Sequence, residues 1–196
     1  MVFRKRTSSG RPVPPPPVDP VAALDRSVVP GRLLEVVDAA VDAAGRWRSV
    51  VGTVQDGPLA ERLHALTQQV VAGVVEIHAV AVRIGEVEGI IAALDPADAT
   101  ADYKAAKRRA AEGAPVPELE ALEARFSSIQ RLLNLVADAD QQLQVLDARL
   151  LAAVARGAEL AITADPRGLS TTGADLDAVV QELGALRGAL VSLGPA

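Results

Sequence analysis

The two histidines are the first residues to test for chemistry, because imidazole is the commonest metal ligand among side chains. His64 follows Glu61 at the Glu-x-x-His spacing of carboxylate di-iron bundles, but such a site needs a second motif of this kind and two further glutamates. The residue three positions before His78 is Val75. Two heptads separate the histidines, which is about 21 Å along a helix, so they cannot share one metal ion within one chain. The sequence therefore predicts no metal site.

Motifs for catalysis and for nucleotide binding are also missing. The chain has no Gly-x-Ser-x-Gly turn, no Walker loop and no Rossmann glycine pattern. It has no cysteine, which excludes disulfides and thiolate-bound metals. Glu86 and Glu88 are two residues apart and would point in different directions from a helix. We therefore expect no enzymatic activity, no cofactor and no small-molecule substrate that this sequence identifies.

Charge is concentrated in an N-terminal tail, residues 1–18. This tail contains four basic residues and no acid, and since the whole chain carries −5, residues 19–196 carry −9. Serine, glycine and proline dominate the tail, and four consecutive prolines favour an extended, solvated backbone. We expect the tail to be disordered and to lie outside a helical domain at 19–196.

The first eleven residues are the best candidate for a functional segment. Phe3 lies beside Arg4, Lys5 and Arg6. Basic side chains attract anionic lipid, and an aromatic ring can insert at the membrane interface. These four residues are therefore candidate contacts with an anionic membrane surface or an acidic partner protein. The alternative is that they form a solvated terminus without a partner.

A second basic cluster offers a weaker case for nucleic acid. Lys104, Lys107, Arg108 and Arg109 lie within six residues of each other. Phosphate binding is mainly electrostatic, so the −9 charge of residues 19–196 argues against it. Only 2% of the chain is aromatic, too little for platforms that stack bases. We expect this cluster to be a solvated helix face, and nucleic acid not to be a partner.

The elements that must carry these residues are helices. Apolar residues between 58 and 94 alternate at spacings of four and three, which predicts a helix about 55 Å long with coiled-coil-like packing. We expect its central seam residues to be buried: Leu63, Leu66, Val70, Ile77, Ile84 and Ile91.

Proline and glycine separate this helix from its neighbours. Caps and periodicity predict a short helix at 20–28, long helices at 32–55 and 117–164, a shorter one at 96–112, and a last one running to about 193. We expect Asp165–Gly168 to form a turn, and Thr172 with Asp175 to approximate a capping box for the last helix. The apolar seam of 117–164 changes phase near 138–142, which predicts a change of packing partners there.

The sequence thus predicts an all-α protein, an elongated antiparallel bundle of three to four long helices. By elimination, we expect a non-catalytic scaffold or adaptor that self-associates into a homo-oligomer through helix seams. No signal peptide and no apolar run of membrane-spanning length is recognisable, so we expect a cytoplasmic protein that is peripheral at a membrane if the tail binds there. The alternative is a regulatory bundle that binds a small ligand, which an apolar cavity near Trp47 or Phe126 would favour.

Overall fold

The computed structural model describes residues 19–54, 57–163 and 165–192, and within these ranges it contains helices and no strand. The all-α class is therefore confirmed. The elements are two short 3₁₀ helices, η1 (Arg26–Val28) and η2 (Gly31–Leu33), and five α-helices, α1 (Leu34–Val51), α2 (Pro58–Ala93), α3 (Pro96–Ala111), α4 (Leu119–Thr163) and α5 (Pro166–Val191).

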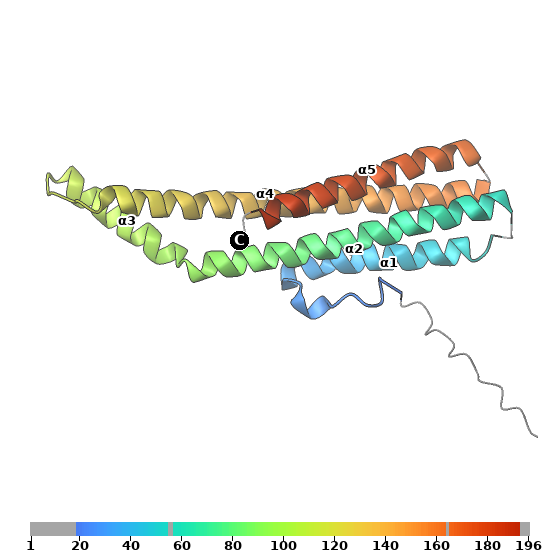
Figure 1. Ribbon diagram of the computed structural model, residues 1–196, viewed down its shortest axis with the longest axis horizontal. Coiled ribbons are helices and arrows are strands. Elements are labelled where there is room, and N and C mark those ends of the chain that lie inside the picture. The colour runs from blue at the N-terminus through green and yellow to red at the C-terminus, as the bar shows by residue number, and fades with distance from the viewer. Residues whose placement is uncertain (1–18, 55–56, 164, 193–196) are drawn as a thin grey trace, which may run out of the picture.

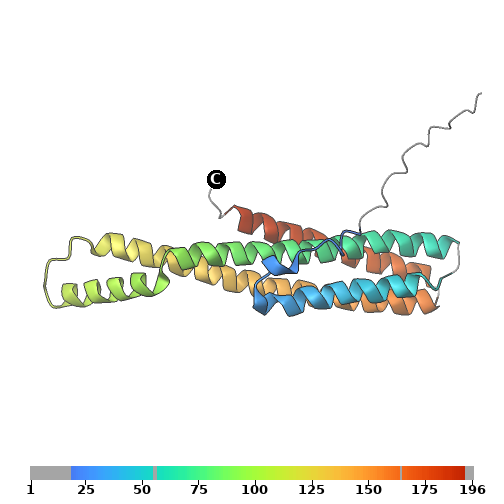
Figure 2. The ribbon, with the colours of Figure 1, turned by 90° about the horizontal axis from the view of Figure 1, so that it is seen from below.

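The molecule is elongated and has two parts (Figure 1). In the body, α1 and α5 lie beside the N-terminal part of α2 and the C-terminal part of α4. In the arm, α3 packs against residues 119–131 of α4 and projects from one end of the body (Figure 2). We call residues 87–94 of α2 and 132–140 of α4 the waist, because α1 begins and α5 ends near this level.

The helices of the body are not all antiparallel to their neighbours. Matched contacts at both ends show that α1 runs in the same direction as α4: Arg32 pairs with Asp140, and the Trp47 ring faces Gly157. The same is true of α2 and α5, because Gln69 binds Asp177 and Glu76 binds Arg187. The pairs α1–α2, α4–α5 and α2–α4 are antiparallel (Figure 1). The arm connects α2 to α4 and reverses the chain far from the body.

The body surrounds one continuous apolar core to which α1, α2, α4 and α5 all contribute. Trp47 is its largest fully buried side chain, and its indole Nε1 donates to the Thr67 hydroxyl over 2.9 Å. Gly157 makes room for this ring, because a Cβ there would lie 2.8 Å from Trp47 Cζ3. The close approach of α1 to α4 therefore depends on a glycine at this position.

In the arm the contacts are fewer and more polar. The rings of Tyr103 and Phe126 stack with centroids 4.8 Å apart, and Lys107 Nζ lies 5.6 Å from the Tyr103 centroid. Arg109 pairs with Glu118 across the tip. Among the described residues of the arm, the fully buried ones are Ala99, Ala106 and Ile129.

Two expected features of the local structure are wrong. Residues 20–28 form a turn and the 3₁₀ helix η1 instead of an α-helix, because Pro30 and Gly31 end the segment before an α-helix could gain enough hydrogen bonds. The last helix begins at Pro166, with the Asp165 carboxylate accepting from the backbone N–H of Arg167. Thr172 is not a cap: it is fully buried, and its hydroxyl donates to the Gly168 carbonyl within α5.

The phase change of α4 lies where its surroundings change. Asp140 pairs with Arg32, which lies just before α1. Before this point α4 packs on α3 and on the end of α2, and after it on α1 and α5 as well. The shift of the apolar seam at 138–142 thus coincides with the entry of α4 into the body.

Candidate functional site

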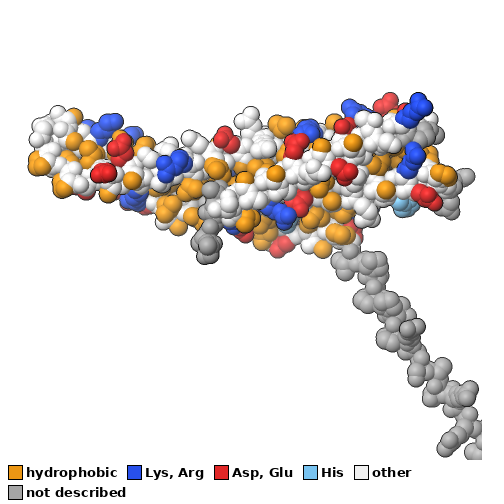
Figure 3. Space-filling model, turned by 45° about the horizontal axis from the view of Figure 1, so that its top comes forward, with side chains coloured by type: hydrophobic (Ala, Val, Ile, Leu, Met, Phe, Trp, Pro, Cys, Tyr) orange, Lys and Arg blue, Asp and Glu red, His pale blue; other side chains and the backbone are white. Residues whose placement is uncertain are grey.

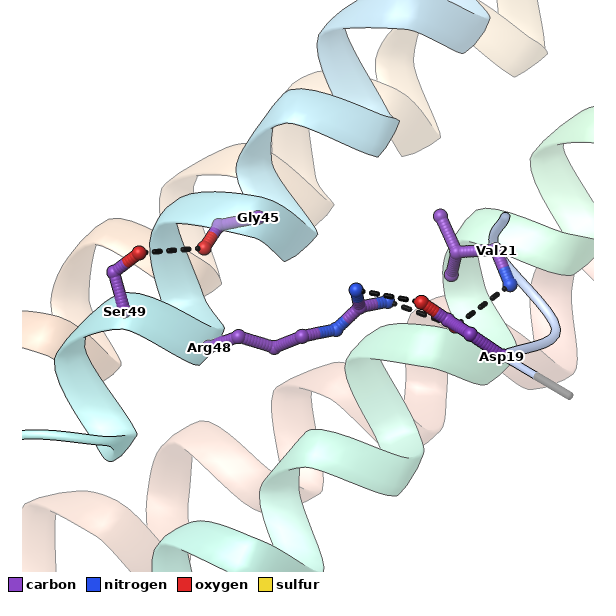
Figure 4. A network of polar contacts seen from close by, with 5 residues as sticks. All are labelled: Asp19, Val21, Gly45, Arg48 and Ser49. Atoms are coloured by element: carbon purple, nitrogen blue, oxygen red, sulfur yellow. Dashed lines mark hydrogen bonds and ion pairs between the residues drawn. The ribbon is translucent and has the colours of Figure 1, made fainter. Parts of the chain in front are cut away.

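The proposed contact residues Phe3, Arg4, Lys5 and Arg6 lie outside the described residues. The structure does describe the segment to which they are attached, residues 19–33, which we call the strap. Asp19 begins the strap and is held by Arg48 of α1: Nη1 lies 2.7 Å from Oδ2, and Nη2 lies 3.0 Å from Oδ1 (Figure 4). Oδ1 also accepts from the Val21 backbone N–H at 3.1 Å. This bidentate pair fixes the point from which the tail leaves the body.

Further contacts fasten the strap along its length. Val21 and Val29 are buried in the core of the body. His78 Nε2 lies 2.8 Å from the Asp25 carbonyl oxygen. Pro30 packs on α2 at Gly85, where a Cβ would approach its Cγ to 2.7 Å. The strap is thus an integral part of the body, and the sequence offered no periodic signal for it.

Two of the grooves beside α1 differ in the character of their lining. The larger, about 990 Å³, lies between α1 and the strap. Its lining contains negatively charged aspartates and positively charged arginines. The smaller, about 300 Å³, lies between α1 and α4 beside Trp47. Its lining is apolar apart from Arg46: Ala43, Arg46, Trp47, Val50, Leu151, Val154, Ala155 and Ala158. An apolar cavity near Trp47 is the feature that the small-ligand alternative requires.

The seam residues of α2 all lie inside the body or at the waist. Their exposed fractions range from 0 to 6% for Leu63, Leu66, Val70, Ile77, Ile84 and Ile91. The seam is thus occupied by the other helices of the same chain. It is not free to form the contacts between copies that self-association through this seam would require.

Exposed apolar side chains gather instead at the waist. Ile90 on α2 is 36% exposed, Leu94 directly after α2 is 41% exposed, and Leu133 on α4 is 38% exposed. Gln69, Glu76 and Arg83 contact α5 at intervals of seven residues, and Ile90 is the next position in this series, beyond the end of α5. Figure 3 shows hydrophobic side chains along the whole of one face of the molecule, from the arm to the body. The three waist residues are exposed because α1 and α5 stop short of them.

One buried carboxylate has an oxygen without a hydrogen-bond partner among the described residues. Asp147 on α4 is 8% exposed, and its Oδ1 has no hydrogen-bond partner among the described residues. Burial raises the pKa of Asp147 from 3.8 to about 6. No motif in the sequence indicates that an acid at position 147 would be buried.

The other polar residues singled out from the sequence, the two histidines and the basic cluster, do not come together in one site. The His64 Nδ1 lies 2.7 Å from the Ala60 carbonyl oxygen in the preceding turn, far from the His78 contact with the strap. No group of three or more potential metal ligands occurs among the residues that the structure describes. In the basic cluster of α3, Arg109 is paired with Glu118 and Lys107 lies over Tyr103. Lys104 and Arg108 are exposed.

No helix within the described ranges combines the length and the apolar character needed to cross a bilayer. Comparison of the chain with protein-family models, with curated proteins and with solved structures found no match.

Proposed function

We propose that this chain is a non-catalytic scaffold or adaptor that self-associates and uses its basic tail to contact an anionic membrane surface or an acidic partner. The observation that carries this proposal is the anchored strap. The Asp19–Arg48 pair holds a +4 tail at a defined point on a body of opposite net charge. Such an attachment lets the tail reach a negative surface while the acidic body stays clear of it.

Self-association is supported by the waist. Ile90, Leu94 and Leu133 lie where buried faces of the body end, and none of the described residues covers them fully. Apolar patches of this kind on a protein surface favour contact with another protein. In this proposal the copies meet at the waist, whereas the seam of α2 holds each copy together in coiled-coil-like fashion, as its alternating spacings of four and three favour.

Avidity links the two parts of the proposal. One tail with four basic residues gains about 4 kcal/mol at an anionic membrane, which corresponds to about millimolar affinity. Several tails on one oligomer bind far more strongly, because later contacts are intramolecular. The protein would then be cytoplasmic and peripheral at a membrane, as an oligomer.

Co-sedimentation with vesicles tests the role of the tail. The full chain should pellet with vesicles containing anionic lipid at low salt and remain in solution with neutral vesicles, and binding should weaken as salt screens the charges. The triple variant Arg4→Ala, Lys5→Ala, Arg6→Ala should not pellet. Equal pelleting of parent and variant would reject the tail as the contact.

Light scattering on the same samples tests self-association. The parent should be larger than one chain, and Ile90→Asp should reduce its mass. Val145→Asp is the matched control, because Val145 is 54% exposed on α4 outside the waist. A parent that remains monomeric at all concentrations would remove self-association from the proposal.

A further inference from the structure

The groove between α1 and α4 has the composition of a site for a small amphipathic anion. The groove of about 300 Å³ opens to the surface between two helices of the body, since Arg46 and Ala155 in its lining are exposed. It exists because Ala43, Ala155 and Ala158 are too small to fill the space between the helices. The buried face of Trp47 forms part of its lining.

One charged side chain lies at this apolar surface. Arg46 lines the groove, is exposed, and forms no ion pair with any described residue. The nearby Arg48 differs, because Asp19 already neutralises it. A guanidinium presents two parallel N–H groups that match the two oxygens of a carboxylate, and a single positive charge balances a single negative one.

We propose that the groove between α1 and α4 binds an aliphatic carboxylate, with the chain lying on the alanines and Trp47 and the head group paired with Arg46. The groove is at the lower limit of the volumes of ligand pockets, which suits a chain of about eight to ten carbons. Asp147 lies on the same row of α4 as Leu151, one turn earlier, so an anionic head group there would be repelled. Arg46 therefore sets the orientation of the ligand.

The inference goes beyond the scaffold function and depends on neither the tail nor self-association. The variant with Arg4, Lys5 and Arg6 replaced by alanine should bind the carboxylate as the parent does. A failure of this site would leave the vesicle and light-scattering results unchanged, and a failure of the scaffold proposal would leave this site unchanged.

Tryptophan fluorescence gives a direct readout, because Trp47 is the only tryptophan in the chain and lines the groove. The probe is decanoate below its micelle concentration, with decanol and decyltrimethylammonium as comparators that carry the same chain. Decanoate should change the emission saturably, and should bind more tightly than octanoate by up to about fourfold for each added methylene. The cationic probe should bind more weakly than either.

Two variants separate the head group from the chain. Arg46→Gln should weaken decanoate binding about tenfold and leave decanol binding unchanged, because only the charge-assisted hydrogen bonds are lost. Ala155→Leu should abolish binding of both by filling the groove. The matched controls are Arg131→Gln, an exposed arginine of the arm, and Ala152→Leu, which lies on the α5 side of α4. Both variants should bind as the parent does.

Any of four results would overturn the proposal. These are a non-saturating response to decanoate, unchanged decanoate affinity in Arg46→Gln, unchanged binding in Ala155→Leu, and equal or tighter binding of the cationic probe. Because Arg46 and Ala155 are exposed, both variants should fold, and their melting temperatures should be measured beside the parent.

Discussion

The body and the arm are built from the same kind of helix but are held together by different interactions. In the body, four helices enclose a continuous apolar core around Trp47. In the arm, two helices face solvent on most sides and rely on the Tyr103–Phe126 stack, Lys107 and the Arg109–Glu118 pair. Exposed ion pairs contribute little to stability, whereas a shared apolar core acts cooperatively. We therefore expect the arm to open locally without unfolding the body.

The largest effect should come from a charge in the core of the body. Ile77→Asp places a carboxylate at a position that is fully buried, and should cost about 4 kcal/mol or more of unfolding free energy. Urea unfolding followed by circular dichroism measures this loss. Ile162→Asp is the control: Ile162 is 82% exposed on the same body, and its substitution should change stability by less than about 0.5 kcal/mol. A stable Ile77→Asp protein would contradict the position of the core.

The free energy of unfolding of the body should also depend on pH, because of the buried Asp147 carboxylate. Because burial raises the pKa of Asp147 from 3.8 to about 6, the folded protein holds this proton more tightly than the unfolded chain does. The stabilising contribution of the Asp147 proton should therefore be fully present below pH 3.8 and lost as pH rises through about 6, which lowers the free energy of unfolding by about 2–3 kcal/mol.

Asp147→Asn tests this dependence, since the amide has nearly the same shape and does not ionise. The variant should gain about 2–3 kcal/mol relative to the parent between pH 4 and pH 8. Thermal unfolding at a series of pH values gives the difference. A parent-to-variant difference that stays constant across this range would show that Asp147 titrates normally.

A smaller and local effect should follow in the arm. Phe126→Ala removes the ring stack and should destabilise the arm by about 1–2 kcal/mol, with the body unchanged. Hydrogen exchange should accelerate at amides of α3 and of residues 119–131, while the unfolding midpoint reported by Trp47 stays where it is. Lys107→Ala should do less, about 0.5 kcal/mol, because its contact with Tyr103 is exposed. If Phe126→Ala lowered the midpoint of the body equally, the two parts would form one cooperative unit.

The same sequence signal, Asp followed by Pro, shows what local patterns can and cannot predict. It occurs at Asp19, Asp95 and Asp165, and it begins an α-helix at the second and third positions only. After Asp19 the chain is too short for a helix before Pro30, and it gains more from packing Val21 and Val29 against the body. Apolar periodicity therefore located the long helices within a few residues. The conformation of the strap depends on its packing against the body, which periodicity does not indicate.

The candidate sites depended even more on contacts between distant residues. The spacing along α2 indicated which residues are buried, because a helix face can be derived from a single segment. The groove beside Trp47 could not be located in this way, since it forms only when residue 43 of α1 meets residue 154 of α4. Likewise, nothing local at Asp147 indicates burial, because its cover comes from packing around α4. Among the candidate sites, only the basic residues of the tail could be identified directly from the sequence, and the tail lies outside the described residues.

The parallel pairing of α1 with α4 and of α2 with α5 has a consequence for how the chain folds. The hairpins α1–α2 and α4–α5 close short loops and can form early and separately. Each parallel pair joins residues that are more than a hundred positions apart, such as Arg32 with Asp140 and Gln69 with Asp177. Contacts of such high separation form late and slow the overall rate. We therefore expect the two hairpins to form first and to dock afterwards, with the arm as the tether that keeps them at a high effective concentration.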